Sequence, residues 1–281
     1  MPIPSRDDRH NFLSADCTNC FGLCCVALSF QRSADFAFDK PAAEPCVNLQ
    51  PDFACGIHRQ LRPSGFKGCT VFDCFGAGQK VAQRSYQGVS WREDPASQQE
   101  MFAVFPVMRD LHELLWYLSE AVELPLDPAL SREVVASYTS TTNLAELIPD
   151  RLLRIDASVH REGVVTLLGR VSEHIRSRMA EPWKRTKNTR DVGPRSDLMG
   201  RTFVGTSLRG ANLRGAYLIA ADLTNADLTM TDLIGADLRD ARLHNANMAE
   251  SLFLTQQQAN SAIGNSATRL PPGLQRPSHW S

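Results

Sequence analysis

The sequence predicts a multidomain protein that joins a cysteine-rich segment, an α-helical unit and a solenoid of short repeats. Three observations support this division. All eight cysteines lie between Cys17 and Cys74, apolar residues then recur at three- and four-residue steps, and from Phe203 an apolar residue returns at every fifth position. Because these patterns occupy separate stretches of the chain, we expect separate structural units.

Composition and charge narrow the class of protein. The chain has 281 residues, of which 43% are hydrophobic and 22% charged, and its net charge is −1. This composition is ordinary for a folded globular protein, and so balanced a charge provides no field that would attract nucleic acid or an anionic membrane. The opening residues lack the features of a signal peptide, and no apolar run could span a bilayer. We therefore expect a cytoplasmic protein with neither a membrane nor a nucleic acid as partner.

Residues 1–94 form the cysteine-rich segment, which we expect to bind metal through thiolates. The candidate ligands are Cys17, Cys20, Cys24, Cys25, Cys46, Cys55, Cys69 and Cys74. A Cys-x-x-Cys turn such as Cys17–Cys20 presents two thiolates to one tetrahedral ion. Zinc is the expected metal, because a segment with few large apolar residues needs a structural staple.

The cysteine spacing leaves other chemistries open. The thiols could form two four-thiolate sites, or an iron or iron–sulfur site with spare ligands. Since Cys24 and Cys25 are adjacent, we expect them to serve different ions or one of them not to be a ligand. Disulfides and a redox pair at Cys17 and Cys20 are further alternatives. His58, three residues after Cys55, is a candidate for a mixed site.

The segment also resembles a family of zinc- or iron-chelating proteins marked by CxxCxxxCC. The resemblance is carried by CTNCFGLCC, CGIHRQLRP and GCTVFDC, in the order that the family shows. It extends over residues 17–79, with His58 at a position where relatives commonly have an aromatic residue. It implies metal binding and nothing more specific.

Residues 95–180 are predicted to form an α-helical unit. One apolar stripe at helical spacing consists of Met101, Phe105, Met108, Leu111, Leu115, Leu118 and Val122. Pro125 and Pro128 end this helix, and Asp127 is placed to cap the next one. No paired Glu-x-x-His or His-Glu-x-x-His motif occurs, so we expect no catalytic metal site on these helices.

Residues 201–255 repeat with a period of five. The repeated residues are Phe203, Leu208, Leu213, Leu218, Leu223, Leu228, Leu233, Leu238, Leu243, Met248 and Phe253, and the residue two positions earlier is usually alanine. On a helix these leucines would scatter around the axis, and on a flat strand they would alternate between faces. All of them can be buried only if the chain turns with the repeat, as in a solenoid.

The triplets ANL, ADL and TDL at this spacing resemble the A(D/N)Lxx signature of pentapeptide-repeat proteins. The resemblance implies a short right-handed quadrilateral parallel β-helix with four repeats per coil and the leucine inward. The residue before each leucine then faces outward, and we expect its substitution to cost little. Residues 256–281 would cap the open end, and the basic, Pro- and Gly-containing residues 181–200 would form a linker.

The expected function is noncatalytic. We expect a metal-binding protein, with structural zinc, whose solenoid is a scaffold or contact surface for an unidentified protein partner. No nucleophile–base constellation is recognisable, so we do not expect an enzyme. An iron–sulfur or redox protein with the same cysteines is the alternative. Some pentapeptide-repeat proteins mimic DNA and inhibit topoisomerases, but the six acidic and five basic residues of 201–255 leave no continuous negative face.

Overall fold

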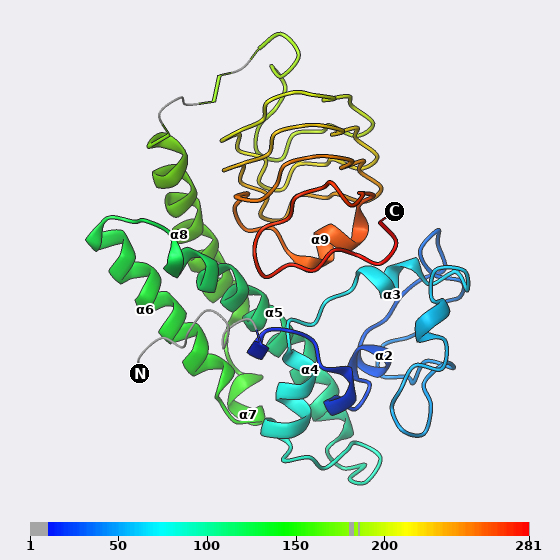
Figure 1. The fold of residues 1–281 in the computed structure, drawn as a ribbon. Helices are drawn as coiled ribbons and strands as arrows, with labels where there is room; N and C mark the ends of the chain where they lie inside the picture. The colour runs from blue at the N-terminus through cyan, green and yellow to red at the C-terminus, as the bar shows by residue number, and fades with distance from the viewer. Residues whose placement is uncertain (1–10, 180–182, 185, 281) are drawn as a thin grey trace. The chain divides into compact units, whose positions relative to one another are not determined.

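The apolar stripe that begins at Met101 forms helix α5 (Gln98–Glu123), which packs against several other helices of the first unit (Figure 1). The structure is a computed structural model that describes residues 11–179, 183–184 and 186–280. Clustering of contacts divides the chain into two units, Met1–Leu168 and Gly169–Ser281.

Helices follow α5 as the periodicity predicts. They are α6 (Pro128–Ala145), α7 (Pro149–Leu152) and α8 (Ala157–Ser177). The predicted cap is confirmed, because the Asp127 carboxylate accepts backbone N–H groups of Ala129 at 3.0 Å and Leu130 at 2.9 Å. His160 Nε2 on α8 lies 2.8 Å from Thr141 Oγ1 on α6. Within the described ranges, no helix is long and apolar enough to cross a lipid bilayer.

The cysteine-rich segment ahead of α5 contains only short helices. These are η1 (Cys17–Asn19), α2 (Leu23–Ala27), η2 (His58–Gln60), α3 (Lys67–Val71), α4 (Ala77–Gln79) and η3 (Lys80–Ser85). Antiparallel bridges pair Phe30 with Lys40 and Leu49 with Cys55. The rings of Phe30 and Phe36 stack with their centroids 4.3 Å apart. The rings of Phe38 and Phe66 contact Phe30 and each other, so an aromatic centre lies beside these bridges.

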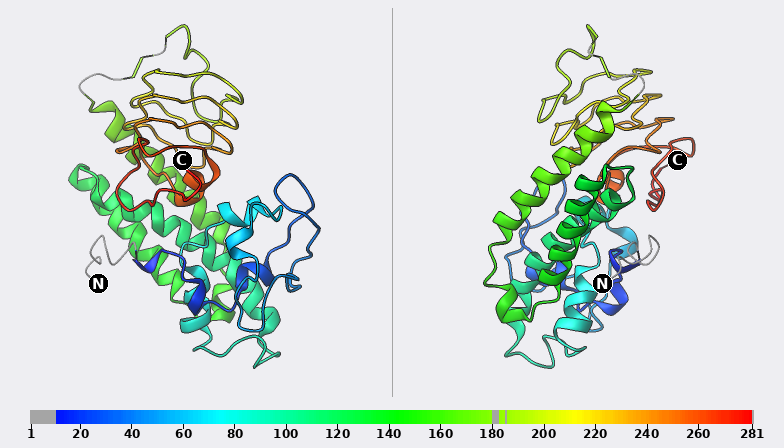
Figure 2. Two further views of the ribbon diagram at one scale, coloured as in Figure 1. Left: turned by 45° about the vertical axis from the view of Figure 1, so that its right-hand side comes forward. Right: turned by 90° about the vertical axis from the view of Figure 1, so that its left-hand side faces the viewer.

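The repeats of the second unit form a coil whose successive turns are twenty residues apart. Parallel bridges pair Thr202 with Asp222 and Asp222 with Arg242, and the same offset recurs on the other sides of the coil. Each turn therefore contains four five-residue repeats, paired through isolated bridges rather than long strands. The inward leucines and alanines form one apolar core, in which Leu208 and Leu223 are completely buried. Figures 1 and 2 show these turns stacked on one another.

The coil begins before residue 201. The backbone N–H of Arg195 donates to the carbonyl of Arg214 at 2.8 Å, and Val192 and Leu198 lie in the apolar core with an exposure of 1% each. Part of the 181–200 stretch, which the composition indicates to be a linker, therefore belongs to the folded coil. Its few apolar residues are separated by Pro, Gly and arginine, which hides them from a periodicity search.

The corners of the coil are formed by residues with positive φ. Every fifth residue from Gly200 to Asn245 has φ between 55° and 73°. At Asp222 and Asp227 the outward carboxylate accepts the backbone N–H two residues later, at 3.0 Å in both cases. The Asp or Asn before each leucine thus caps the following corner, a larger role than the sequence analysis assigns to it.

Helix α9 (Gln256–Ser261) follows the last repeat. Thr255 and Gln258 form a capping box at its start. The Gln258 Nε2 atom also donates to the carbonyls of Leu233 at 2.7 Å and Ala236 at 2.9 Å, on the last complete turn. A single buried side chain therefore both starts the helix and holds it against the coil.

Candidate metal centre

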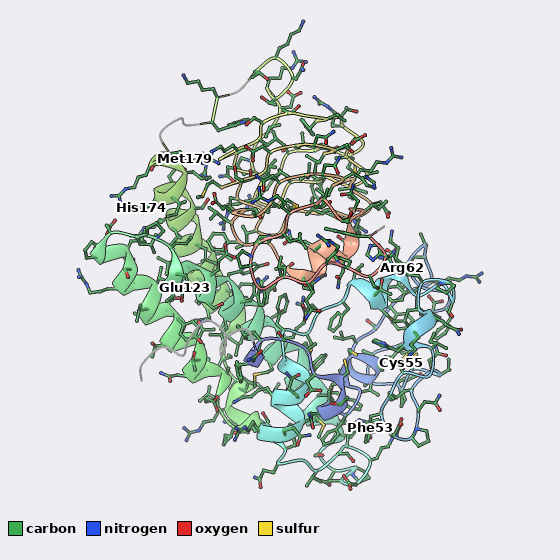
Figure 3. The ribbon with its side chains drawn as sticks, viewed as in Figure 1. Phe53, Cys55, Arg62, Glu123, His174 and Met179 are labelled. Carbon is green, nitrogen blue, oxygen red and sulfur yellow. The ribbon has the colours of Figure 1, made fainter. Side chains whose placement is uncertain are left out.

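The eight cysteines lie on the short helices and loops of the cysteine-rich segment. η1 and its C-terminal end carry Cys17 and Cys20, α2 carries Cys24 and Cys25, α3 carries Cys69, and Cys46, Cys55 and Cys74 lie in loops. All eight are free thiols with half-buried or exposed side chains. Figure 3 shows Cys55 beside α2. These segments are far apart in sequence, and the fold brings their sulfur atoms into one region.

Local geometry places sulfur atoms next to one another at two points. The Sγ atoms of Cys24 and Cys25 lie 3.9 Å apart, close to the roughly 3.8 Å between sulfurs around tetrahedral zinc. Cys20 and Cys74 flank Gly78, where an added Cβ would lie 2.6 Å from Cys20 Sγ and 3.8 Å from Cys74 Sγ. Gly78 therefore leaves room for the sulfur atom of Cys20, which a larger residue would displace, whereas Cys74 Sγ lies at an ordinary contact distance.

The thiols influence one another electrostatically in two overlapping sets. Burial, with the nearby thiols of Cys74 and Cys17, raises the pKa of Cys20 to about 12. Burial, with the thiols of Cys25, Cys46 and Cys55, raises the pKa of Cys69 to about 12. We name Cys17, Cys20, Cys24 and Cys74 the Cys74 group and Cys25, Cys46, Cys55 and Cys69 the Cys69 group. The two groups also interact with each other, through Cys25 with Cys17 and Cys24 and through Cys55 with Cys17. So many thiols cannot ionise together unless a cation neutralises them.

Backbone N–H groups oppose this effect at several sulfur atoms. The sulfur of Cys20 receives the N–H groups of Leu23 and Gly22. The sulfur of Cys74 receives those of Gly78 and Gly76, and the sulfur of Cys55 receives that of Ile57. In each case the N–H donates to the sulfur and lowers the pKa of the thiol, because a positive dipole end favours the thiolate. Thiolate is the form of cysteine that binds metal.

The donor chemistry fits a soft divalent metal, but the thiols do not form a finished coordination sphere. Among the described residues, no group of three or more His, Cys, Asp or Glu side chains is arranged to hold a metal ion. The structure places the eight predicted residues in one segment, with contact between sulfur atoms at Cys24 and Cys25. It does not by itself establish which of them share an ion.

Two histidines near the cluster differ in their surroundings. His58 is exposed at the start of η2, and its backbone N–H donates to the carbonyl of Cys55 at 3.1 Å. His112 on α5 is completely buried, and its Nδ1 lies 2.7 Å from the carbonyl of Phe75, the residue after Cys74. His112 therefore supports the loop that carries Cys74, a role that the helical periodicity alone does not reveal.

Sequence reasoning missed Lys40. Its side chain is 4% exposed, and its ammonium group donates only to backbone carbonyls. Burial lowers the pKa of Lys40, and the nearby thiols of Cys46 and Cys25 oppose this shift. A lone lysine that follows Phe36 and Phe38 and precedes Pro41 carries no spacing signal that could have identified it.

One known protein is similar to this chain over almost its whole length. YybG of Bacillus subtilis (strain 168), itself an uncharacterized protein, is 50% identical over 278 residues, which are 99% of this chain and 98% of YybG. The chain belongs to the YybG family. The match extends through the residues of both units.

The repeats also match a known family. The model of pentapeptide repeats matches residues 202–240 and 216–253, with 8 copies, which confirms the predicted repeat. The resemblance of residues 17–79 to the CxxCxxxCC proteins stays a prediction.

Solved structures similar to the chain are pentapeptide-repeat proteins. Rfr23 from the cyanobacterium Cyanothece 51142 is 26% identical over 31% of this chain and 52% of its own, with a TM-score of 0.22. AT2G44920 from the Arabidopsis thaliana thylakoid lumen is 27% identical over 29% of this chain and 58% of its own, with a TM-score of 0.16. The chain thus spans little more than half the length of these proteins, and superpositions with such low scores add nothing to the fold described above.

Proposed function

We propose that this YybG relative is a noncatalytic, zinc-binding scaffold protein. In this proposal the thiols of the cysteine-rich segment hold structural zinc, and the pentapeptide-repeat coil presents a surface to a protein partner. The observation that carries the proposal is the gathering of all eight thiols of the chain, unpaired, in one region of the first unit. Such thiols persist in a reducing compartment, which supports a cytoplasmic location.

Zinc would cross-link the loops of this segment. The segment lacks long helices and strands, so metal–thiolate bonds would supply folding free energy that its small apolar centre does not. Cys20, Cys55 and Cys74 already receive backbone N–H groups that stabilise thiolate. The role of the chain's own residues is to hold sulfur atoms close together and to offset their negative charge.

The coil suits a contact surface better than a mimic of DNA. Two of its acidic residues are paired with arginines of the same coil: the buried Asp232 with Arg214 at 3.2 Å and the half-buried Asp237 with Arg239 at 2.6 Å. These pairs neutralise charge that a mimic would need to display as a continuous negative face. A protein partner therefore accords better with the distribution of charge than gyrase or another DNA-binding enzyme.

Elemental analysis of protein purified without oxygen tests the metal proposal. We expect one or two zinc ions per chain, no visible absorption, and thiols that become fully reactive only after a chelator is added. A brown protein that contains iron and sulfide would replace zinc with an iron–sulfur cluster. Metal-free protein with eight reactive thiols and an unchanged fold would overturn the proposal.

A further inference from the structure

Lys40 is a buried ammonium group held by the end of a helix. Its Nζ donates to the carbonyls of Val26 at 3.1 Å, Leu28 at 2.5 Å and Pro41 at 2.9 Å. These acceptors use all three N–H bonds of the ammonium group. Val26 and Leu28 lie at the C-terminal end of α2, where the helix dipole favours a positive charge.

No carboxylate of the described residues forms an ion pair with Lys40. A charge buried without an opposite charge is costly, even where its hydrogen bonds are complete. The groups that favour the charged form are the thiols of Cys46, Cys25 and Cys24 and the exposed carboxylate of Glu44. Val26, whose carbonyl accepts from the ammonium group, directly follows Cys25, so the buried positive charge lies beside the segment that carries Cys25.

The backbone fixes this arrangement from both sides. Lys40 and Phe30 exchange backbone hydrogen bonds of 2.8 Å and 3.0 Å, and the N–H of Cys46 donates to the carbonyl of Cys25 at 2.9 Å. The ammonium group is thus bonded to backbone that follows Cys25 and precedes Cys46. These three hydrogen bonds hold the end of the Lys40 side chain in one position.

We propose that Lys40 is the fixed countercharge of a metal–thiolate centre in the Cys69 group. This inference rests on the proposed function. A divalent ion with four thiolates has a formal charge of about −2, which is expensive to hold away from water without a cation. Lys40 supplies that cation, and through Val26 and Leu28 it also positions the helix that carries Cys25. Lys80, the buried lysine that follows Cys74 in the chain, is instead neutralised by an ion pair with the carboxylate of Glu146.

Substitution of Lys40 in the full-length chain tests this role. Lys40→Met removes the charge and keeps the length of the side chain, whereas Lys40→Arg keeps the charge. Zinc affinity is measured by competition with a chromophoric chelator, and Co²⁺ is added to report thiolate coordination through its charge-transfer absorption. We expect Lys40→Met to weaken the affinity for one zinc ion about 10- to 100-fold, as other outer-sphere partners of a metal site do. Lys40→Arg should recover most of this loss, and Lys187→Met, at an exposed position in the second unit, should cause none.

A role in charge balance is separated from a role in folding by unfolding each chain with and without zinc. If Lys40 only ties the end of α2, Lys40→Met destabilises both forms equally, and the proposal is overturned. If it balances the centre, the loss is larger in the zinc-loaded form, which supports the proposal even if the variant folds poorly without metal. If the wild type and Lys40→Met bind zinc equally well, the role of Lys40 is overturned and the proposed function is not. Wild-type protein that binds no zinc would overturn both the role of Lys40 and the proposed function.

Discussion

At the scale of single residues, the Asp or Asn before each leucine shows how the repeat sequence shapes the coil. The Asp227 carboxylate accepts the Thr229 N–H at 3.0 Å and the Thr229 hydroxyl at 2.7 Å. We expect Asp227→Ala to lower the free energy of unfolding of the coil by about 1 kcal/mol, because a corner loses its cap. Glu250→Ala, at an exposed position in the same coil, is the control and should change it by less than about 0.5 kcal/mol. Equal effects in urea melts would show that the carboxylate does not cap the corner.

Another residue-scale prediction concerns His112. Burial lowers the pKa of His112 to about 4 from an ordinary value of 6.5. The unfolded chain therefore binds this proton at a higher pH than the folded chain, so stability present above pH 6.5 is lost as the pH falls toward 4. We expect the wild type to lose about 2 kcal/mol more than His112→Gln between pH 7 and pH 5. Parallel pH profiles for the two proteins in urea unfolding would contradict this account.

At the scale of elements, the sequence predicts those features that burial makes periodic. The stripe from Met101 becomes α5, Asp127 caps α6, and the period of five becomes a coil with four repeats per turn. The course of the cysteine-rich segment could not be predicted, because its short helices are held by contacts between distant residues. Lys40 bonds to Val26 across fourteen positions without any motif. The same limit applies to the candidate site, whose thiols are evident in the sequence but whose grouping and countercharge are not.

Helix α4 provides a prediction about packing beside the thiols. Gly78→Ala would place a Cβ about 2.6 Å from Cys20 Sγ, closer than real Cβ atoms approach sulfur, so the thiol must move. We expect fewer zinc ions per chain and a lower melting temperature of the first unit. Gly163→Ala in α8 is a matched control, because its added Cβ meets nothing within 4 Å, and it should stabilise the helix by up to about 1 kcal/mol. Equal zinc content in both variants, measured by elemental analysis, would argue against close packing at Gly78.

The segment before the coil provides a prediction about proteolysis. Lys184, Lys187 and Arg190 are exposed, whereas the backbone of Arg195 is already bonded into the first turn. Trypsin should therefore cut first between Lys184 and Arg190, because cleavage requires backbone that opens easily. Mass spectrometry should detect a stable fragment that contains the complete coil. Earlier cleavage after Arg195, whose side chain is exposed but whose backbone is hydrogen-bonded, would contradict the proposed start of the coil.

At the scale of the whole molecule, the two parts have different sources of stability. Each turn of the coil stacks its buried leucines on those of the next turn, so the coil is stabilised by contacts between neighbouring repeats. The cysteine-rich segment has eight thiols, short helices and a small aromatic centre. Its fold is expected to depend on metal, and the fold of the coil is not.

Hydrogen–deuterium exchange of the full-length protein with and without a strong zinc chelator tests this difference most directly. The account predicts that chelation releases zinc and removes amide protection from residues 17–79, while amides of residues 195–255 exchange as slowly as before. Protection that stays unchanged in residues 17–79 after the metal has been removed would contradict the central claim that metal–thiolate bonds hold this segment together.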